Sequence, residues 1–571
     1  MESFAKLKRR GTDLFSSLPH NLPSMPQLPH LPHRGGTSSN SSAPTMKGTW
    51  QHVAIPPLPR SSHSLDIVAG NAYIFGGEVE PRQPVDNDMH VIALPSSGAP
   101  ADYYAVKARP SPKQQQRPAE PQHPAPITEE DDEDYETEAQ LKDPLSEVPL
   151  ASPPPAAEEE PEPSSASDKG KGKSALPASD SVPRARVGHA SAVIGSRIFI
   201  FGGRAAPSSS EPLDEGGRVW VFETKTHAWR ALDPWKDSPI PPARSYFAAV
   251  ATDKPRDFAI KPLRRASSWK EWAEGDSADV GIPQRPVAGS VAEHATDEED
   301  AGFGTFIVHG GCVVAGGGRT NDVWAFDVRS RTWKELPPAP GPARGGAALA
   351  LARGRLYRFG GFDGEAELGG QLDVLELALD GFDDRVSRGE VGVFARGGWT
   401  SILSPVTTSV PPPADGEEQQ QQETAKLVPV PEWPANRSVA SLELVLGGGG
   451  REYLVLMLGE RAPSAERSHA AAGSFCADVW TFQVPPEGMS AASFRDAVLQ
   501  AIGRPTGEEK WTRVVARPYD AEDPIDARGP GARGWVAGAP LGDLEENAIL
   551  VFGGLNEKNE RLGDGWIFRL D

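Results

Sequence analysis

One phrase recurs along this chain and limits what it can fold into: an arginine, a short apolar stretch, then an aromatic residue and Gly-Gly. The six copies begin at Arg60, Arg186, Arg244, Arg344, Arg437 and Arg533. In the copies from Arg60, Arg186 and Arg344 the first glycine comes 16 residues after the arginine. The copy from Arg244 is interrupted, and the copy from Arg437 keeps only the second glycine. Such repetition predicts stacked structural units rather than one irregular core.

A second phrase follows each glycine pair, and its clearest copy is NDVWAFDV from Asn321. ADVWTFQV from Ala477 and GDGWIFRL from Gly563 share its pattern. A tryptophan or tyrosine usually closes the unit: Tyr104, Trp229, Trp333, Trp399 and Trp511. Each unit thus holds four short β-like runs separated by turn residues. We interpret the Asp-Val-Trp triplets as structural positions.

With four strands per unit and a period of about 50 residues, the chain resembles the kelch repeat family of β-propellers. The resemblance covers about 45–110, 183–402 and 433–571. It implies an all-β fold, a six-bladed kelch-type β-propeller with four-stranded blades. The central domain of galactose oxidases is similar, but this chain lacks the pattern of their copper site.

The last unit ends after its third strand, at Asp571, and therefore lacks a fourth strand of its own. The segment KGTWQHVAIPPLP, around Trp50, matches a fourth strand and precedes the first repeat arginine. We predict that Trp50 to Ile55 completes the final blade and closes the ring, which removes exposed sheet edges. The alternative is a ring with an open seam.

The propeller is expected to span 46–571, with disordered insertions at about 108–182, 253–302 and 403–430 and a disordered tail at 1–45. These segments are rich in Pro, Ser, Gln or acid and bury too little apolar area to fold. Of the net charge of −21, the stretch 129–162 carries −13, from 14 acidic residues and one lysine. This stretch is a solvated spacer or, alternatively, a segment that folds back over the arginines.

The composition limits which cellular compartment and which kinds of partner are expected. Two cysteines, Cys312 and Cys476, cannot build a disulfide framework, and this usage fits a reducing compartment. The N-terminus lacks an apolar stretch of signal-peptide length, and no apolar run is long enough to span a membrane. We expect a cytoplasmic or nuclear protein that binds no nucleic acid. The oligomeric state stays open.

The repeat arginines are the candidate binding residues. The resemblance implies that they circle one mouth of the ring: Arg60, Arg186, Arg204, Arg244, Arg344, Arg437 and Arg533. Guanidinium groups favour bidentate contact with carboxylate or phosphate. This predicts a non-catalytic protein-interaction module or scaffold that binds an acidic or phosphorylated peptide. Alternatively, each arginine pairs inside its blade with carboxylates such as Glu78 or Asp363.

A metal-dependent enzyme on the same scaffold, of the oxidase or specifier-protein type, is the rival hypothesis. Galactose oxidases use a copper site with a Cys–Tyr cross-link, and specifier proteins use a carboxylate-rich iron site. Here the cysteines lie in ordinary blade segments and no comparable ligand set is recognisable. His63, His189 and His309 are interpreted as strand residues rather than metal ligands. No catalytic residue, metal site or cofactor is predicted.

Overall fold

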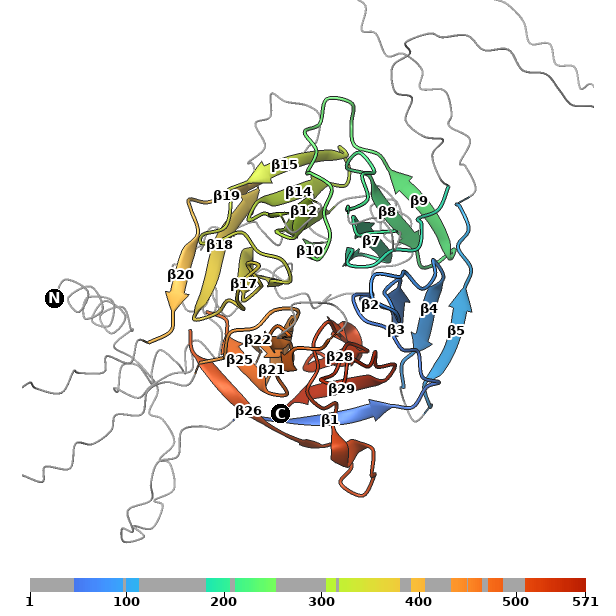
Figure 1. The fold of residues 1–571 in the computed structure, drawn as a ribbon, viewed down its shortest axis with the longest axis vertical. Coiled ribbons are helices and arrows are strands. Elements are labelled where there is room, and N and C mark those ends of the chain that lie inside the picture. The colour runs from blue at the N-terminus through green and yellow to red at the C-terminus, as the bar shows by residue number, and fades with distance from the viewer. Residues whose placement is uncertain are drawn as a thin grey trace, which may run out of the picture. The chain divides into compact units, whose positions relative to one another are not determined.

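The computed structural model describes residues 46–95, 99–111, 181–205, 211–252, 304–314, 318–379, 392–405, 433–448, 450–464, 471–485 and 509–571. These residues form six antiparallel blades arranged as a ring (Figure 1). The predicted tail 1–45 and nearly all of the three predicted insertions lie outside the described residues. No helix in the described part is long and apolar enough to cross a membrane.

Each blade is numbered here along the chain, with its strands given from the ring centre outward. Blade 1 contains β2 (Ser64–Val68), β3 (Asn71–Phe75), β4 (Met89–Ala93) and β5 (Asp102–Val106). Blade 2 contains β6 (Ala190–Ile194), β7 (Arg197–Phe201), β8 (Val219–Glu223) and β9 (Ala228–Leu232). Blade 3 contains β10 (Ala248–Thr252), β11 (Thr305–His309), β14 (Val323–Asp327) and β15 (Thr332–Leu336).

The second half of the ring repeats this pattern with additions. Blade 4 contains β16 (Ala348–Ala352), β17 (Arg355–Phe359), β18 (Gln371–Leu379) and β20 (Thr400–Leu403), and β19 (Val393–Ala395) also pairs with β18. Blade 5 contains β21 (Ser441–Gly447), β22 (Arg451–Met457), β25 (Val479–Gln483) and β26 (Trp511–Pro518). Blade 6 contains β27 (Ala537–Pro540), β28 (Ala548–Phe552), β29 (Gly565–Leu570) and β1 (Met46–Val53).

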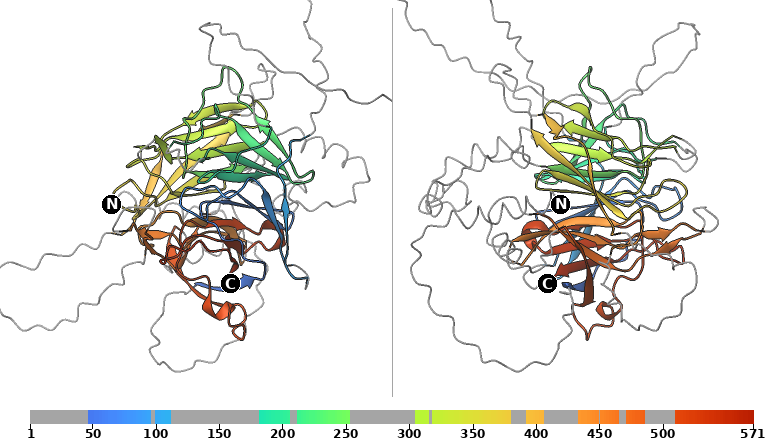
Figure 2. Two further views of the ribbon diagram at one scale, coloured as in Figure 1. Left: turned by 45° about the vertical axis from the view of Figure 1, so that its right-hand side comes forward. Right: turned by 90° about the vertical axis from the view of Figure 1, so that its left-hand side faces the viewer.

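Short elements decorate these blades. Two small ribbons pair β12 (Cys312–Val314) with β13 (Gly318–Arg319), and β23 (Glu460–Ala462) with β24 (Ser474–Phe475). The 3-10 helix η2 (Asp526–Arg528) lies in a segment that projects from the outer edge of the ring beyond β26 (Figures 1 and 2). A second 3-10 helix, η3 (Gly542–Leu544), lies between β27 and β28.

The N-terminal strand closes the ring, as the sequence predicted. β1 pairs antiparallel with β29, with Trp50 opposite Phe568. The strand is longer at its start than predicted, and it ends at Val53. The other edge of β1 pairs in parallel with β26 of blade 5, from Met46 opposite Val514 onward. Blades 5 and 6 therefore share one continuous eight-stranded sheet.

The hydrophobic core is divided among the joints between blades. Six buried apolar clusters occur in the described residues, and each fills the space between two neighbouring blades. In the joint between blades 1 and 2, Trp229 packs on Phe75 and Phe222, with ring centroids 5.0 Å apart in both pairs. Such tilted aromatic pairs add to the stability gained from burial alone. The strand aromatics of the repeat thus hold adjacent blades together.

A closed belt of backbone hydrogen bonds surrounds the centre of the ring. Its members are the residues two positions after each repeat arginine: Ser62, Gly188, Tyr246, Gly346, Val439 and Trp535. Each donates its N–H to the carbonyl of the belt residue in the preceding blade, and the N–H of Ser62 meets the carbonyl of Trp535 at 3.2 Å. All six have positive φ, between 45° and 64°. The belt joins all six blades at the same level.

Candidate functional site: a pocket at the centre of the ring

The six repeat arginines lie one per blade, but they are buried instead of lining an open mouth. Their exposed fractions are between 0% and 3%. In each blade Nη1 donates to the carbonyl of the residue at the first Gly-Gly position, for example from Arg186 to Gly202 at 3.0 Å. The same contact in blade 5 goes to Leu458, at 2.9 Å. The arginine and the glycine turn are thus parts of one structural motif.

Four of these arginines form bidentate pairs with a carboxylate from the same blade. The pairs are Arg186–Glu215, Arg244–Asp322, Arg437–Asp478 and Arg533–Asp564. In blade 3 both guanidinium-to-carboxylate distances are 2.8 Å, and the indole N–H of Trp324 donates to the same carboxylate at 2.8 Å. Burial alone would raise the pKa of Asp322, but the hydrogen bonds and charge of Arg244 outweigh it and lower the pKa. This contact explains the Asp-Val-Trp phrase, because its aspartate accepts hydrogen bonds from both the repeat arginine and the tryptophan of the phrase.

Blades 1 and 4 vary the arrangement. In blade 1, His90 takes the tryptophan position, and Arg60 lies 3.9 Å from the carboxylate of Asp86. In blade 4, Asp373 occupies the tryptophan position and forms a fully buried pair with Arg358 at 2.6 Å. Arg344 has no carboxylate within ion-pair distance among the described residues, and burial followed by the charge of Arg358 lowers its pKa to about 10.

Most of the repeat arginines therefore pair inside their blades, which is the alternative that the sequence left open. Their partners are not the two carboxylates named there, Glu78 and Asp363. Glu78 pairs with Arg561 at 3.2 Å, and Asp363 accepts hydrogen bonds from backbone N–H groups of its own turn. The expectation that all seven arginines surround the mouth is corrected, because six of them are enclosed in the blade interior. Arg204 alone among the seven lines the pocket described next.

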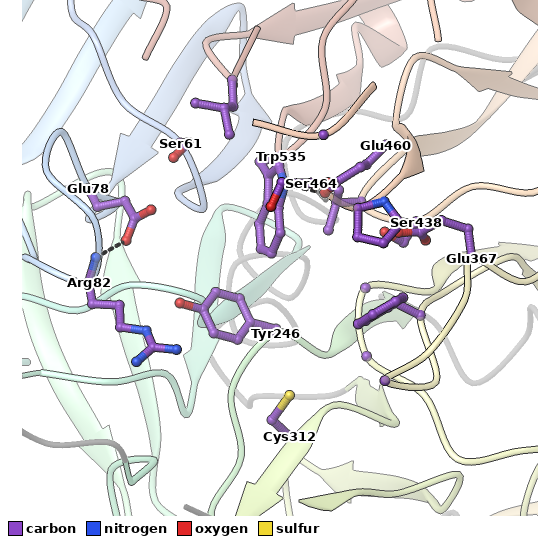
Figure 3. Close-up of a pocket in the computed structure, with 18 of the residues that line it drawn as sticks. Ser61, Glu78, Arg82, Tyr246, Cys312, Glu367, Ser438, Glu460, Ser464 and Trp535 are labelled. Carbon is purple, nitrogen blue, oxygen red and sulfur yellow. Dashed lines mark hydrogen bonds between the residues drawn. The ribbon is translucent and has the colours of Figure 1, made fainter. Parts of the chain in front are cut away.

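A cavity of about 490 Å³ occupies the centre of the ring (Figure 3). Every blade contributes to it the residue that directly follows its glycine turn: Glu78, Arg204, Cys312, Phe362, Glu460 and Leu555. These residues are fixed by backbone bridges to the residue after each repeat arginine, such as Ser61 with Glu78. Backbone pairing thus holds this position rigidly while its side chain differs from blade to blade.

Tyr246 and Trp535 form the floor of this pocket. Their rings meet edge-to-face, with centroids 5.5 Å apart. Both residues also line a second cavity of about 210 Å³ between the innermost strands. Asp66 and Glu443 belong to the innermost strands β2 and β21, and Glu443 lines this second cavity. The two aromatic rings therefore lie between a pocket at the mouth and an inner cavity.

One side of the pocket is basic. Arg204 donates from Nε to Ser245 at 2.8 Å, and its guanidinium carbon lies 5.6 Å from the centroid of Tyr246. Arg319 lies nearer the other side, 5.0 Å from the centroid of Phe362 in blade 4, the blade that contains Glu367. The exposed side chain of Arg82 has no hydrogen-bond or ion-pair partner in the described part of the chain. In Figure 3, Arg82 and Glu78 lie on one side of the pocket, away from Glu367.

The opposite side carries two carboxyl groups, Glu367 and Glu460, near Ser438 (Figure 3). Burial raises the pKa of Glu367 to about 8, with the charges of Glu460 and Asp363 adding to the effect. Burial also raises the pKa of Glu460, against a hydrogen bond from Trp535. At neutral pH Glu367 is therefore largely protonated.

The histidines that the sequence singled out lie in blade packing. His63 and His189 occupy the same repeat position and stack edge-on against Phe552 and Phe75 of the preceding blades. Burial lowers the pKa of both, so they are neutral near pH 7. Nδ1 of His309 donates to the backbone carbonyl of Asp322 at 2.9 Å. Across the described residues, no three His, Cys, Asp or Glu side chains gather as a metal site.

Apart from Arg204, sequence reasoning missed the pocket residues because they do not repeat. Only their position is shared, directly after the glycine turn, while their chemistry ranges from Glu78 to Leu555. Reading the residue after each Gly-Gly would have found them. The tyrosine predicted to close blade 1, Tyr104, is 39% exposed, and its neighbour Tyr103 packs against the core instead.

Six four-stranded sheets around a central axis define the chain as a β-propeller. Two Kelch motif models match residues 185–234, which contain all of blade 2, and 304–340, which contain β11 to β15. Two of its blades thus match Kelch motif models, in agreement with the predicted kelch-type propeller.

Two individual proteins show limited similarity. The chain is 36% identical over 74 residues to N-(sulfonatooxy)prop-2-enimidothioate sulfolyase of Thlaspi arvense. That stretch covers 12% of this chain and 21% of the relative, so the chain spans about a fifth of the relative's length. The solved structure of YjhT aligns with 90% of this chain and 95% of that chain, at 10% identity and a TM-score of 0.40.

Proposed function

We propose that the chain is a non-catalytic protein-interaction module, or scaffold, that binds an acidic or phosphorylated segment of a partner in the central pocket. Kelch repeats generally mediate protein–protein interaction. The binding surface is formed by the turn residues at the mouth and not by the buried repeat arginines. Arg204 is the member of the predicted arginine set that carries the proposal.

The supporting observation is the charge of the pocket. Four guanidinium groups line it: Arg82, Arg204, Arg319 and Arg561. Three carboxyl groups oppose them, but Glu78 is paired with Arg561 and Glu367 is largely protonated at neutral pH. Positive charge therefore exceeds negative charge in a cavity with low-dielectric walls, which favours an anionic side chain. Arg82 is exposed and is placed to meet such a group first.

The test uses acetylated peptide amides that differ by one group: GGEGG against GGQGG, and the phosphoserine form of GGSGG against its unmodified form. Calorimetry to millimolar concentrations should show tighter binding of each anionic member, weakened by added salt. Arg82→Ala should reduce that preference roughly five- to tenfold, in line with a lost charged hydrogen bond. Arg230→Ala, at an exposed arginine on β9, is the matched control.

Equal binding of the charged and uncharged peptides by the wild-type protein would contradict the proposal. So would a preference that survives Arg82→Ala as well as it survives Arg230→Ala. Both variants change exposed residues, so their thermal unfolding should match the wild type.

A metal-dependent enzyme of the oxidase or specifier-protein type is the second candidate function, favoured by the 74-residue match to a sulfolyase. It predicts stoichiometric iron or copper in the protein purified without chelators. Elemental analysis distinguishes the two functions, because an interaction module needs no bound transition metal.

A further inference from the structure

The acidic side of the central pocket contains a buried carboxyl group without an adequate partner. Glu367 is 7% exposed, and its Oε2 has no hydrogen-bond partner in the described part of the chain. Glu460 is 9% exposed and accepts a hydrogen bond from the indole of Trp535 at 2.9 Å. Within the described ranges, neither carboxyl lies within ion-pair distance of a basic side chain. Such burial costs free energy unless something else compensates.

The two sides of the pocket have opposite polarity. The basic side presents the unpartnered guanidinium group of Arg82, while Glu367 and Glu460 lie across the aromatic floor (Figure 3). Of the other charged groups that line the pocket, Glu78 pairs with Arg561, Arg204 donates to Ser245, and Arg319 lies over the ring of Phe362. The volume of about 490 Å³ has room for more than one side chain.

We propose that Glu367 and Glu460 form a subsite for a cationic side chain, so that the pocket binds a partner segment carrying a lysine or arginine beside its acidic residue. This inference rests on the proposed function, because the acidic residue is placed at Arg82 and Arg204. A bound ammonium or guanidinium group donates to the free Oε2 of Glu367 and provides the ion pair that this carboxyl lacks.

Binding by this route releases a proton. The carboxylic acid of Glu367 gives up its proton to solvent, and the resulting carboxylate pairs with the incoming cation. The other groups that face Glu367 act on the same equilibrium: Glu460 and Asp363 favour its protonated form, and Arg319 and the hydroxyl of Ser438 favour the carboxylate. Because the free pocket holds this proton at neutral pH, its release reports occupation of the subsite.

The experiment compares four acetylated peptide amides: GEGKG, GEGQG, GQGKG and GQGQG. We expect the full-length protein to bind GEGKG roughly tenfold more tightly than GEGQG, about the worth of one charged hydrogen bond. Calorimetry at pH 7 in phosphate and in Tris, which differ in ionisation enthalpy, should show release of close to one proton with GEGKG. The peptide GEGQG should release almost none.

Glu367→Gln is the test variant, since it keeps the shape of the side chain and removes its charge. It should abolish the advantage of GEGKG over GEGQG and the proton release. Glu443→Gln is the matched control: burial also raises the pKa of Glu443 to about 8, but this side chain lines the inner cavity beyond Tyr246 and Trp535. It should bind all four peptides as the wild type does.

The outcomes separate this inference from the proposed function. If GEGQG binds better than GQGQG but lysine adds nothing, the cationic subsite is wrong and the acidic site stands. If the lysine advantage survives Glu367→Gln, the cation binds elsewhere and the inference is again wrong. If glutamate adds no affinity either beside lysine or beside glutamine, the proposed function fails. The comparison of GQGKG with GQGQG then tests the carboxyl subsite by itself.

Discussion

Tyr246 of blade 3 and Trp535 of blade 6 meet edge-to-face at the centre of the ring, with ring planes at 87°. These blades are opposite members of a ring of six, so the contact spans the channel. Both residues take the left-handed conformation, with φ of 54° and 57°, at a belt position where blades 2 and 4 have Gly188 and Gly346. The aromatic floor is therefore retained despite a backbone conformation that favours glycine.

This relationship predicts an unusual order of stability at Trp535. Trp535→Gly should be more stable than Trp535→Ala by about 1 kcal/mol, because both lose the ring but only glycine removes the left-handed strain. Urea unfolding of the two variants measures the difference. At an ordinary strand position such as Ala325, which has no positive φ, glycine should instead be the less stable residue. A Trp535→Ala variant at least as stable as Trp535→Gly would contradict the proposed strain.

The blade arginine pairs should dominate the polar contribution to stability. Asp322→Ala leaves Arg244 buried without its carboxylate and also removes the acceptor of the Trp324 indole, so it should cost about 3–5 kcal/mol. Asp233→Ala breaks the exposed pair with Arg218 and should cost no more than about 1 kcal/mol. Denaturant unfolding of both variants compares them. Similar costs would show that the blade pairs add no more than surface pairs do.

Glu443 should make the stability fall as the pH rises. Burial raises its pKa from 4.5 to about 8, followed in size by a lowering hydrogen bond from Ser441 and a raising charge at Asp66. Its stabilising contribution is complete below the unfolded value and is lost as the pH rises towards the folded value. Glu443→Gln should therefore gain stability relative to the wild type between about pH 5 and pH 9.

Urea unfolding at the two pH values measures this gain. Glu376→Gln, at a half-exposed carboxylate paired with Arg355, is the control and should leave the pH dependence unchanged. A wild type and Glu443→Gln variant with parallel pH profiles would show that Glu443 ionises as freely in the folded protein as in the unfolded chain.

The ring closure depends on Trp50. Its side chain is 5% exposed and packs on Phe568 with ring centroids 5.0 Å apart, so Trp50→Ala should cost about 3–5 kcal/mol. Trp235→Ala changes a side chain that is 60% exposed and should cost less than about 0.5 kcal/mol. Thermal and denaturant unfolding measure both. An unchanged stability for Trp50→Ala would mean that the N-terminal strand contributes little to closure.

Much of the fold followed from the sequence because each blade repeats the same phrases. The missing strand after Asp571 and the strand-like segment around Trp50 together predicted the closure that β1 and β29 show. The carboxylate partners of the repeat arginines could not be predicted from the repeats in the same way. Their carboxylate partners lie 29 residues away in blade 2 and 78 in blade 3, since insertions change the spacing.

The pocket was harder still to predict, for a related reason. Glu78, Cys312 and Phe362 occupy equivalent backbone positions but share no chemistry, so repetition gives no signal for them. Glu367 lies in the turn that follows one of these positions, and only the folded structure shows that its carboxyl is enclosed. Repeated residues specify the scaffold, whereas the residues that differ among blades specify the surface a ligand meets.

The parallel pairing of β1 with β26 has a mechanical consequence. In a propeller the joint where the two chain ends meet is ordinarily a candidate for the weakest link, because no covalent connection crosses it. Here that joint is the pairing of β1 with β29 inside blade 6, and β1 is held along its other edge as well, by β26 of blade 5, from Met46 opposite Val514 to Trp50 opposite Pro518. Tension applied along β1 near the N-terminus is thus shared by blades 5 and 6. The hydrogen bonds on both edges of the strand are then loaded together, in shear, and do not break one after another.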